Sequence, residues 1–158
     1  MNRLWAPWRQ QYIEQDPKDQ CIFCLAVESG IGFSRLVLDL NEHSLVLLNR
    51  FPYSNGHLMV APRHHAGELN QVPSGERLSL LNEVNRSIEI LKKLYKPEGF
   101  NVGMNIGRAA GAGFPGHLHI HIVPRWNGDI NFMPALSEVK VISAHLEKVY
   151  NDLEKHYR

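Results

Sequence analysis

Gly116-His-Leu-His-Ile-His-Ile-Val-Pro-Arg125 contains three histidines that alternate with apolar residues. Successive side chains of a β-strand point to opposite faces, so a strand here carries three imidazoles on one face and apolar side chains on the other. Imidazole is the side chain best suited to attack, accept a proton or bind a metal near neutral pH. A solvated histidine-rich strand is the alternative, but the spacing favours a chemical site.

A glycine-rich segment, residues 107–116, leads into this strand. Glycine permits positive φ and close backbone approach, so such a loop can aim N–H groups at an anion beside the histidines. A flexible hairpin connection would have the same composition. The segment is no Walker A loop, because no Gly-Lys-Ser/Thr follows it and no helix opens after it.

The chain length and charge suit a compact enzyme. A chain of 158 residues predicts a single domain over 1–158, with an N-terminal extension at 1–20. The net charge is only +1, and charged residues of both signs are spread along the sequence. This pattern indicates neither a nucleic acid nor a membrane partner. The first residues lack the apolar run of a signal peptide, so a cytoplasmic location is expected. No organic cofactor is expected in catalysis.

The apolar periodicity predicts several strands and two helices. Residues 35–40 and 43–49 predict a hairpin, 57–61 a third strand ended by Pro62, and 100–106 and 117–123 two more. Between the third and fourth strands a helix is expected from its apolar spacing and its end signals: Leu81, Val84, Ile88 and Leu91, with Ser74 as N-cap and Pro97 and Gly99 as stops. A C-terminal helix is expected at about 138–157, from Ile142, Leu146, Val149 and Leu153. This order favours an α+β fold on an antiparallel sheet.

Two cysteines occur in Cys21-Ile-Phe-Cys24. In a reducing compartment such a pair is typical of metal binding or redox chemistry, and two buried thiols are the alternative. The redox interpretation is weaker, because the pair does not open a helix within a thioredoxin-like pattern. A zinc ion would need two further ligands, and histidines are plentiful.

The sequence resembles the histidine triad family of nucleotide hydrolases and transferases, whose signature is His-φ-His-φ-His-φ-φ with φ apolar. Residues 117–123 match it completely, and the resemblance extends over most of 21–135, through the segments 49–62 and 124–132. Segments 5–9 and 124–129 are similar to the bacterial branch that contains diadenosine tetraphosphate phosphorylases. The resemblance implies a five-stranded antiparallel sheet with one long inserted helix and a C-terminal helix, in a homodimer whose sheets join.

The resemblance also implies an activity. It predicts cleavage of a dinucleoside polyphosphate or an adenylyl conjugate through a covalent nucleotidyl-histidine, with an adenine nucleotide as substrate. A non-catalytic, zinc-stabilised nucleotide-binding module is the alternative. Water or inorganic phosphate remains open as the acceptor, because Ala112 and Gly113 stand where hydrolases and phosphorylases of the family carry a Gln or a Ser.

Roles for the histidines follow. His119 is expected to be the nucleophile, with Nδ1–H donating to a backbone carbonyl so that Nε2 keeps a lone pair. His121 is expected to donate a hydrogen bond to the phosphate or a proton to the leaving group. His117 is expected to be a zinc ligand or an orienting neighbour. The zinc-containing members of the family imply a ligand set of Cys21, Cys24, His65 and His117, with His64 as an adjacent competitor.

Substrate contacts are also implied. The resemblance makes Asn49 a ribose ligand, although a turn cap is an equal interpretation of this residue. Asn105 and the backbone of Gly113 and Phe114 are expected to meet phosphate. Trp126 is expected to stack on a base. His57 is a candidate supporting group at the same site, with an ordinary core histidine as the alternative.

Overall fold

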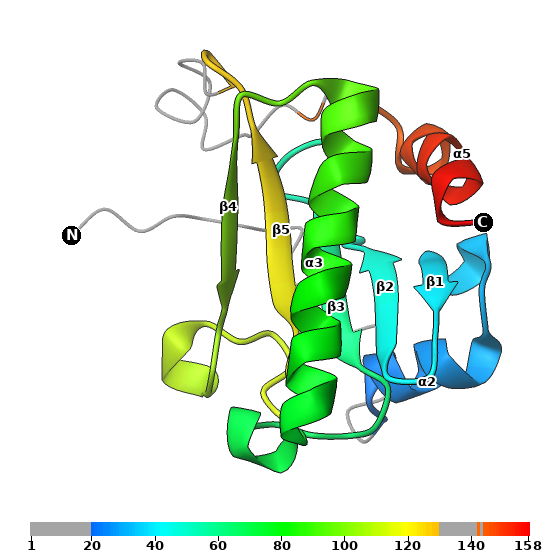
Figure 1. The fold of residues 1–158 in the computed structure, drawn as a ribbon. Helices are drawn as coiled ribbons and strands as arrows, with labels where there is room; N and C mark the ends of the chain where they lie inside the picture. Colours follow the sequence, from blue (N-terminus) through cyan, green and yellow to red (C-terminus); the bar gives the residue numbers. More distant parts are fainter. Residues whose placement is uncertain (1–19, 130–141, 143) are drawn as a thin grey trace.

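The computed structural model describes residues 20–129, 142 and 144–158. One five-stranded antiparallel sheet with the order β1-β2-β3-β5-β4 forms its centre (Figure 1). The strands are β1 (Val37–Leu40), β2 (Ser44–Leu48), β3 (Leu58–Pro62), β4 (Gly99–Met104) and β5 (Ile120–Arg125). The predicted α+β class and five-stranded antiparallel sheet are therefore confirmed.

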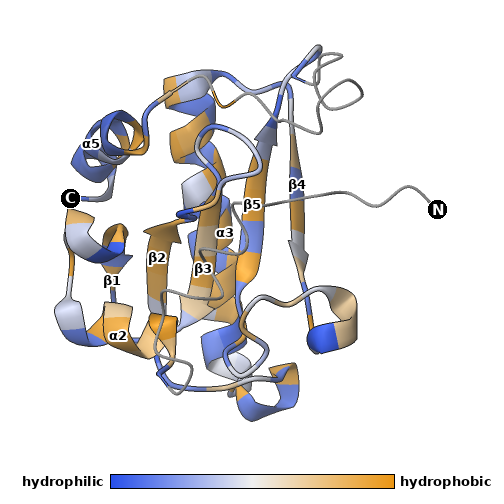
Figure 2. Ribbon diagram, turned by 180° about the vertical axis from the view of Figure 1, so that it is seen from behind, coloured by the Kyte–Doolittle hydropathy of each residue, from blue (hydrophilic) through white to orange (hydrophobic). Residues whose placement is uncertain are grey.

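Helices cover both faces of the sheet. On one face lie α3 (Ser74–Tyr95) and α5 (Leu146–Tyr157). On the other face lies α2 (Ile22–Ser29), and Figure 2 views the molecule from that side, opposite to the view of Figure 1. The side chains of β2 alternate between the two cores: Val46 and Leu48 face α3, while Leu45 and Leu47 face α2. The 3-10 turns are η1 (Phe33–Arg35), η2 (Leu69–Gln71) and η3 (Arg108–Ala110). Among the described helices, none combines the length and apolarity needed to cross a membrane.

The alternation around β5 is as predicted, but the strand is shorter. Leu118, Ile120 and Ile122 are buried in the core under α3. The strand begins at Ile120 rather than at residue 117, because the Leu118 N–H donates to the Ala66 carbonyl at 2.6 Å instead of pairing within the sheet. The neighbouring strand β4 ends at Met104 rather than at residue 106.

The long helix α3 was predicted, but two details of its first half were wrong. Pro73, not Ser74, occupies the cap position, and the Arg77 N–H bonds the Pro73 carbonyl. Leu80 rather than Leu81 faces the core, and Leu81 is 59% exposed. The helix ends at Tyr95, and its C-cap is Lys96, which has a left-handed φ of 48°. Pro97 follows the cap as the predicted stop signal.

The C-terminal helix starts later than predicted, and one helix near the cysteine pair was not predicted. The C-terminal helix starts at Leu146, and Ile142, Ala144 and His145 precede it without helical structure. The rest of the predicted start, 138–141 and 143, lies outside the described residues, as do residues 1–19 of the N-terminal extension. Helix α2 was not predicted: the cysteine pair does open a helix, but outside any βαβ unit.

Candidate functional site

Two cysteines and two histidines converge where α2 meets the ends of β3 and β5. Cys21 caps α2 and Cys24 lies in its first turn, so both thiols lie at the same end of that helix. The Cys21 Sγ is 3.3 Å from His117 Nδ1, and the Cys24 Sγ is 3.4 Å from His65 Nδ1 and 3.8 Å from His117 Nδ1. The four atoms all lie within 4.8 Å of one another. Such spacing can hold one tetrahedral metal ion.

The surrounding hydrogen bonds fit a metal. The His117 Nε2–H donates to the Pro62 carbonyl at 2.8 Å, which leaves the Nδ1 lone pair directed at the cysteines. Burial raises the pKa of the Cys21 thiol to about 11, so a thiolate here needs a bound cation. Two thiolates and two imidazoles form a donor set typical of structural zinc. The competitor His64 instead directs its Nδ1 at a Glu76 carboxylate oxygen 3.1 Å away, so the geometry favours His65 as the ligand.

His119 has one ring nitrogen tied to the backbone. Its Nδ1–H donates to the His117 carbonyl at 2.8 Å, which confirms the predicted hydrogen bond. The Nε2 atom therefore keeps its lone pair. Burial lowers the pKa of this imidazole, whose residue is only 6% exposed, so it is neutral at neutral pH. The Phe23 ring packs on it, with centroids 4.8 Å apart and planes tilted by 30°.

His57 and His121 form a directed pair. The Tyr53 backbone N–H donates to His57 Nδ1 at 3.0 Å, so the proton of a neutral His57 sits on Nε2. That Nε2 lies 3.0 Å from His121 Nδ1, which accepts the hydrogen bond. The proton of His121 consequently sits on its own Nε2. Burial, followed by repulsion from His119, lowers the pKa of His121 to about 4, so this ring is also neutral.

Sequence reasoning named His57 only as a candidate supporting residue. The pairing arises because β3 and β5 are neighbours, with Met59 opposite His121 in the register. On the other side of His121, β4 places Gly103 opposite it. A Cβ at Gly103 would meet nothing within 4 Å, so there is open space beside the histidine.

The predicted substrate residues are only partly brought together. The Asn49 Oδ1 accepts the Phe51 N–H at 2.9 Å, so this residue does cap a turn. Phe114 packs edge-on against Phe23 at 6.4 Å and thus lies beside the histidine face. Gly113 precedes it in the loop, and Asn105 follows β4. Gly107 and Gly111 of the same loop have φ of 81° and 84°, which explains their need for glycine.

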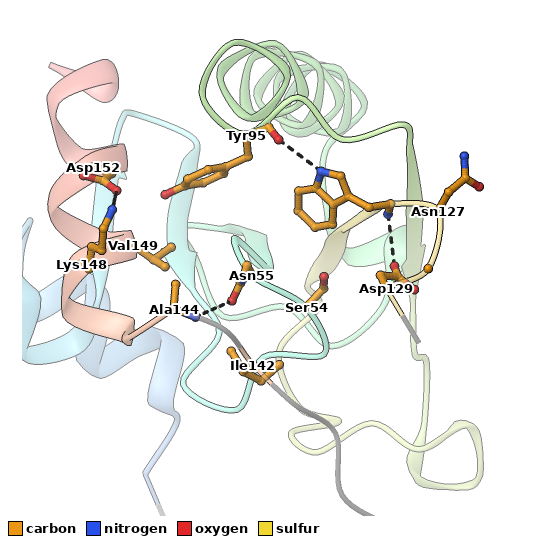
Figure 3. A pocket seen from close by; sticks show the side chains of 12 residues that line it. Ser54, Asn55, Tyr95, Asn127, Asp129, Ile142, Ala144, Lys148, Val149 and Asp152 are labelled. Atoms are coloured by element: carbon orange, nitrogen blue, oxygen red, sulfur yellow. Dashed lines mark hydrogen bonds and ion pairs between the residues drawn. The ribbon is translucent and has the colours of Figure 1, made fainter. Parts of the chain in front are cut away.

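Trp126 lies on the opposite face from the histidines. Its indole N–H donates to the Tyr95 carbonyl at 3.2 Å, at the end of α3 (Figure 3). It lines a pocket of about 410 Å³ together with Ser54, Asn55 and side chains of α5. The structure therefore separates Trp126 from the triad.

The antiparallel sheet, the inserted helix and the clustered imidazoles define a histidine triad protein. A family model described as the HIT domain matches residues 34–128, so the chain belongs to the histidine triad (HIT) family.

Two relatives and one solved structure illustrate the similarity. The chain is 36% identical over 155 residues to an AP-4-A phosphorylase of Mycobacterium tuberculosis strain H37Rv, covering 90% of this chain and 77% of the relative. It is 34% identical over 107 residues to the adenosine 5'-monophosphoramidase hnt1 of Schizosaccharomyces pombe, covering 68% and 75%. A zinc-bound histidine triad family protein from Mycobacterium smegmatis superposes with a TM-score of 0.69 at 24% identity, covering 87% of this chain and 92% of the other.

Proposed function

We propose that this chain transfers an adenylyl group from a dinucleoside polyphosphate, or from an adenylyl conjugate, through a covalent intermediate on His119. The observation that carries the proposal is the hydrogen bond from His119 Nδ1 to the His117 carbonyl, which leaves a neutral, lone-pair nitrogen at Nε2. A neutral nucleophile approaches a charged phosphate without repulsion. The similarity to a phosphorylase and to a monophosphoramidase supports adenine nucleotide substrates.

In the first step, the His119 Nε2 lone pair forms a bond to the α-phosphorus. The bond between that phosphorus and the bridging oxygen breaks, and its electrons leave with the oxygen of the departing polyphosphate. The Nε2–H of His121 donates a hydrogen bond to this oxygen, supported by the hydrogen bond that His57 gives to His121 Nδ1. A polyphosphate departs as an anion and needs no proton. With adenosine phosphoramidate the P–N bond breaks instead, and the departing amine takes up a proton from solvent.

In the second step, an acceptor oxygen attacks the same phosphorus, and the electrons of the N–P bond return to His119 Nε2. When the acceptor is water, the proton that it loses passes to solvent. With inorganic phosphate the adenylyl group becomes ADP, and with water it becomes AMP. Similarity to the phosphorylase favours phosphate. Asn49, Asn105 and the backbone of Gly113 and Phe114 are the proposed contacts to ribose and phosphate.

We also propose a structural zinc at Cys21, Cys24, His65 and His117. When bound, zinc would tie α2 to the ends of β3 and β5. The side chains of these four residues would supply all four ligands of a tetrahedral zinc ion, with no position left for a water molecule. The chemistry is therefore assigned to the imidazoles. The zinc-bound relative supports this choice of metal.

A homodimer with joined sheets is proposed as the assembly. β4 is an edge strand, and an edge presents N–H and C=O groups to another chain. Val102, Met104 and Ile106, on or just after this strand, are exposed apolar residues. Pairing of β4 with β4 of a second copy would cover both the unpaired backbone groups of the edge and these apolar side chains.

Product analysis tests the activity. Labelled diadenosine tetraphosphate is incubated with the protein, with and without inorganic phosphate. ATP plus ADP appearing only with phosphate indicates phosphorolysis, and ATP plus AMP without phosphate indicates hydrolysis. Binding of the nucleotide with no turnover of it or of adenosine phosphoramidate would contradict the proposal and favour the binding module.

A further inference from the structure

Five aromatic rings form a row of successive contacts along the histidine face, and the row bends at His57, because the Tyr53 ring lies 6.1 Å from His121 as well as 4.8 Å from His57. The order is Phe23, His119, His121, His57 and Tyr53, and successive ring centroids lie 4.8, 4.9, 5.1 and 4.8 Å apart. The two ends differ in their environment. Phe23 is 1% exposed, whereas Tyr53 is 47% exposed. The row therefore opens to solvent at its tyrosine end.

The loop beneath Tyr53 holds the ring in place. The backbone N–H of Tyr53 donates to His57 Nδ1, and the neighbouring Ser54 carbonyl accepts the His57 backbone N–H at 3.2 Å. Gly56 of this loop has a φ of 73°, and a Cβ there would lie 3.0 Å from Leu91 Cδ2, so the loop packs closely on α3. The exposed phenol is thus presented by an anchored backbone, tied to the same His57 that bonds His121.

The contacts of Tyr53 associate it with His121 and His57 and therefore with the leaving side of the proposed reaction. The adenylyl phosphorus must lie at His119, and the departing oxygen at His121. Whatever the departing oxygen carries continues away from the nucleophile, since an in-line displacement places attacking and leaving atoms on opposite sides of the phosphorus. Tyr53 lies beside His121, the residue proposed to meet the departing oxygen, with its ring centroid 6.1 Å from that of His121. An exposed aromatic face at this position can stack on a planar base.

We propose that Tyr53 forms a subsite for the leaving group, in which its ring stacks on the base of the second nucleoside of a dinucleoside polyphosphate. This inference rests on the proposed adenylyl transfer. The subsite recognises a flat aromatic group that is joined to the departing phosphate through a flexible chain. It accepts any nucleobase, because every base has a π-face.

The test compares two substrates that share one polyphosphate. Diadenosine tetraphosphate carries the second nucleoside, and adenosine 5'-tetraphosphate lacks it. Stacking on an aromatic side chain contributes roughly 5- to 150-fold per base in alanine-substitution experiments. Tyr53→Ala should therefore lower kcat/KM for diadenosine tetraphosphate roughly ten-fold or more beyond its effect on adenosine tetraphosphate, mainly through KM. Tyr53→Phe, which keeps the ring face, should restore the preference for the dinucleotide.

Phe33→Ala is the matched control. This aromatic ring is similarly exposed but packs edge-on against Tyr150 at 5.4 Å, away from the row, and its removal should leave the ratio of the two substrates unchanged. An equal loss for both substrates in Tyr53→Ala would overturn the subsite and assign Tyr53 to the support of His57. Adenosine phosphoramidate provides a second substrate without a base on the leaving side. A wild-type protein inactive on all three substrates would contradict the adenylyl transfer itself.

Discussion

The His57 Nε2 lies 3.0 Å from His121 Nδ1, and the backbone N–H of Tyr53 determines which of these rings donates. The His57 Nε2–H donates to His121 Nδ1, so the proton of His121 sits on Nε2, which is free of this hydrogen bond. The hydrogen bond from His57 therefore sets the tautomer in which His121 Nε2 carries the proton. The space beside Gly103, opposite His121 in the sheet, is open.

This coupling predicts non-additive kinetics. His121→Asn should lower kcat roughly a hundred-fold or more, because the departing oxygen loses its hydrogen-bond donor. His57→Asn should lower it less. The double variant should match His121→Asn alone, since residues that act as a unit do not add. Multiplied single effects in the double variant would show that the two histidines act independently.

The nucleophile gives a larger effect. His119→Asn should reduce turnover roughly a thousand-fold or more while nucleotide binding persists, because the covalent route is lost. Rapid acid quenching of the wild type, followed by mass spectrometry, should place an acid-labile adduct on the peptide 117–125. Near-normal turnover in His119→Asn, with its folding checked by circular dichroism, would refute the assignment.

The metal site predicts about one zinc per chain. Cys21→Ser, Cys24→Ser or His65→Ala should each reduce the zinc content and lower Tm. His64→Ala is the matched control, because His64 is adjacent but pairs with Glu76, and it should retain the metal. The zinc content of each reduced, carefully purified protein is measured by metal analysis. Absence of zinc, or its loss in His64→Ala but not in His65→Ala, would contradict the ligand set.

Acid should weaken the fold through the buried imidazoles. Burial lowers the pKa of His121 from 6.5 to about 4, so the unfolded chain takes up a proton that the folded chain refuses. The free energy of unfolding should therefore fall as the pH drops through this interval, by at most about 1.4 kcal/mol per pH unit for this one group. Denaturant unfolding at several pH values should show a shallower fall in His121→Gln. An identical pH slope in both proteins would contradict the shift.

The edge strand predicts a concentration-dependent dimer. Val102→Lys combined with Met104→Lys should shift the protein toward monomer in analytical ultracentrifugation, because charged side chains on an edge strand oppose pairing. Ile31→Lys is a suitable control, since Ile31 is exposed but lies away from β4. A dimer that survives the β4 changes and breaks in the control would place the interface elsewhere.

The apolar periodicity of the sequence predicted the helices and strands better than the contacts between them. The alternation around His119 identified both faces of β5, because burial of every second residue leaves a direct trace in sequence. Helix α2 left no such trace: it has eight residues, and its cap is a cysteine without a side-chain capping bond. Leu81 satisfied the helical rhythm, yet Leu80 is the buried neighbour, since a rhythm of two or three turns does not fix the phase of a helix.

Contacts between distant residues were harder to predict. The four candidate metal ligands were named from the resemblance to known proteins, and the structure brings their ligand atoms within 4.8 Å of one another. The hydrogen bond between His57 and His121 depends on the register of β3 against β5, which no local pattern encodes. Trp126 was expected at a base, but its indole follows the end of β5 toward α3, where a carbonyl accepts its N–H. Residue type alone does not reveal which way a chain turns after a strand.

In His117, His119 and His57, a backbone group sets the position of the ring proton. A carbonyl of Pro62 serves His117, a carbonyl of His117 serves His119, and an N–H of Tyr53 serves His57. Backbone groups survive almost any change of side chain. The protonation pattern is therefore inherited with the path of the chain, and sequences that drift widely around these histidines can keep the same tautomers as long as the loops keep their course.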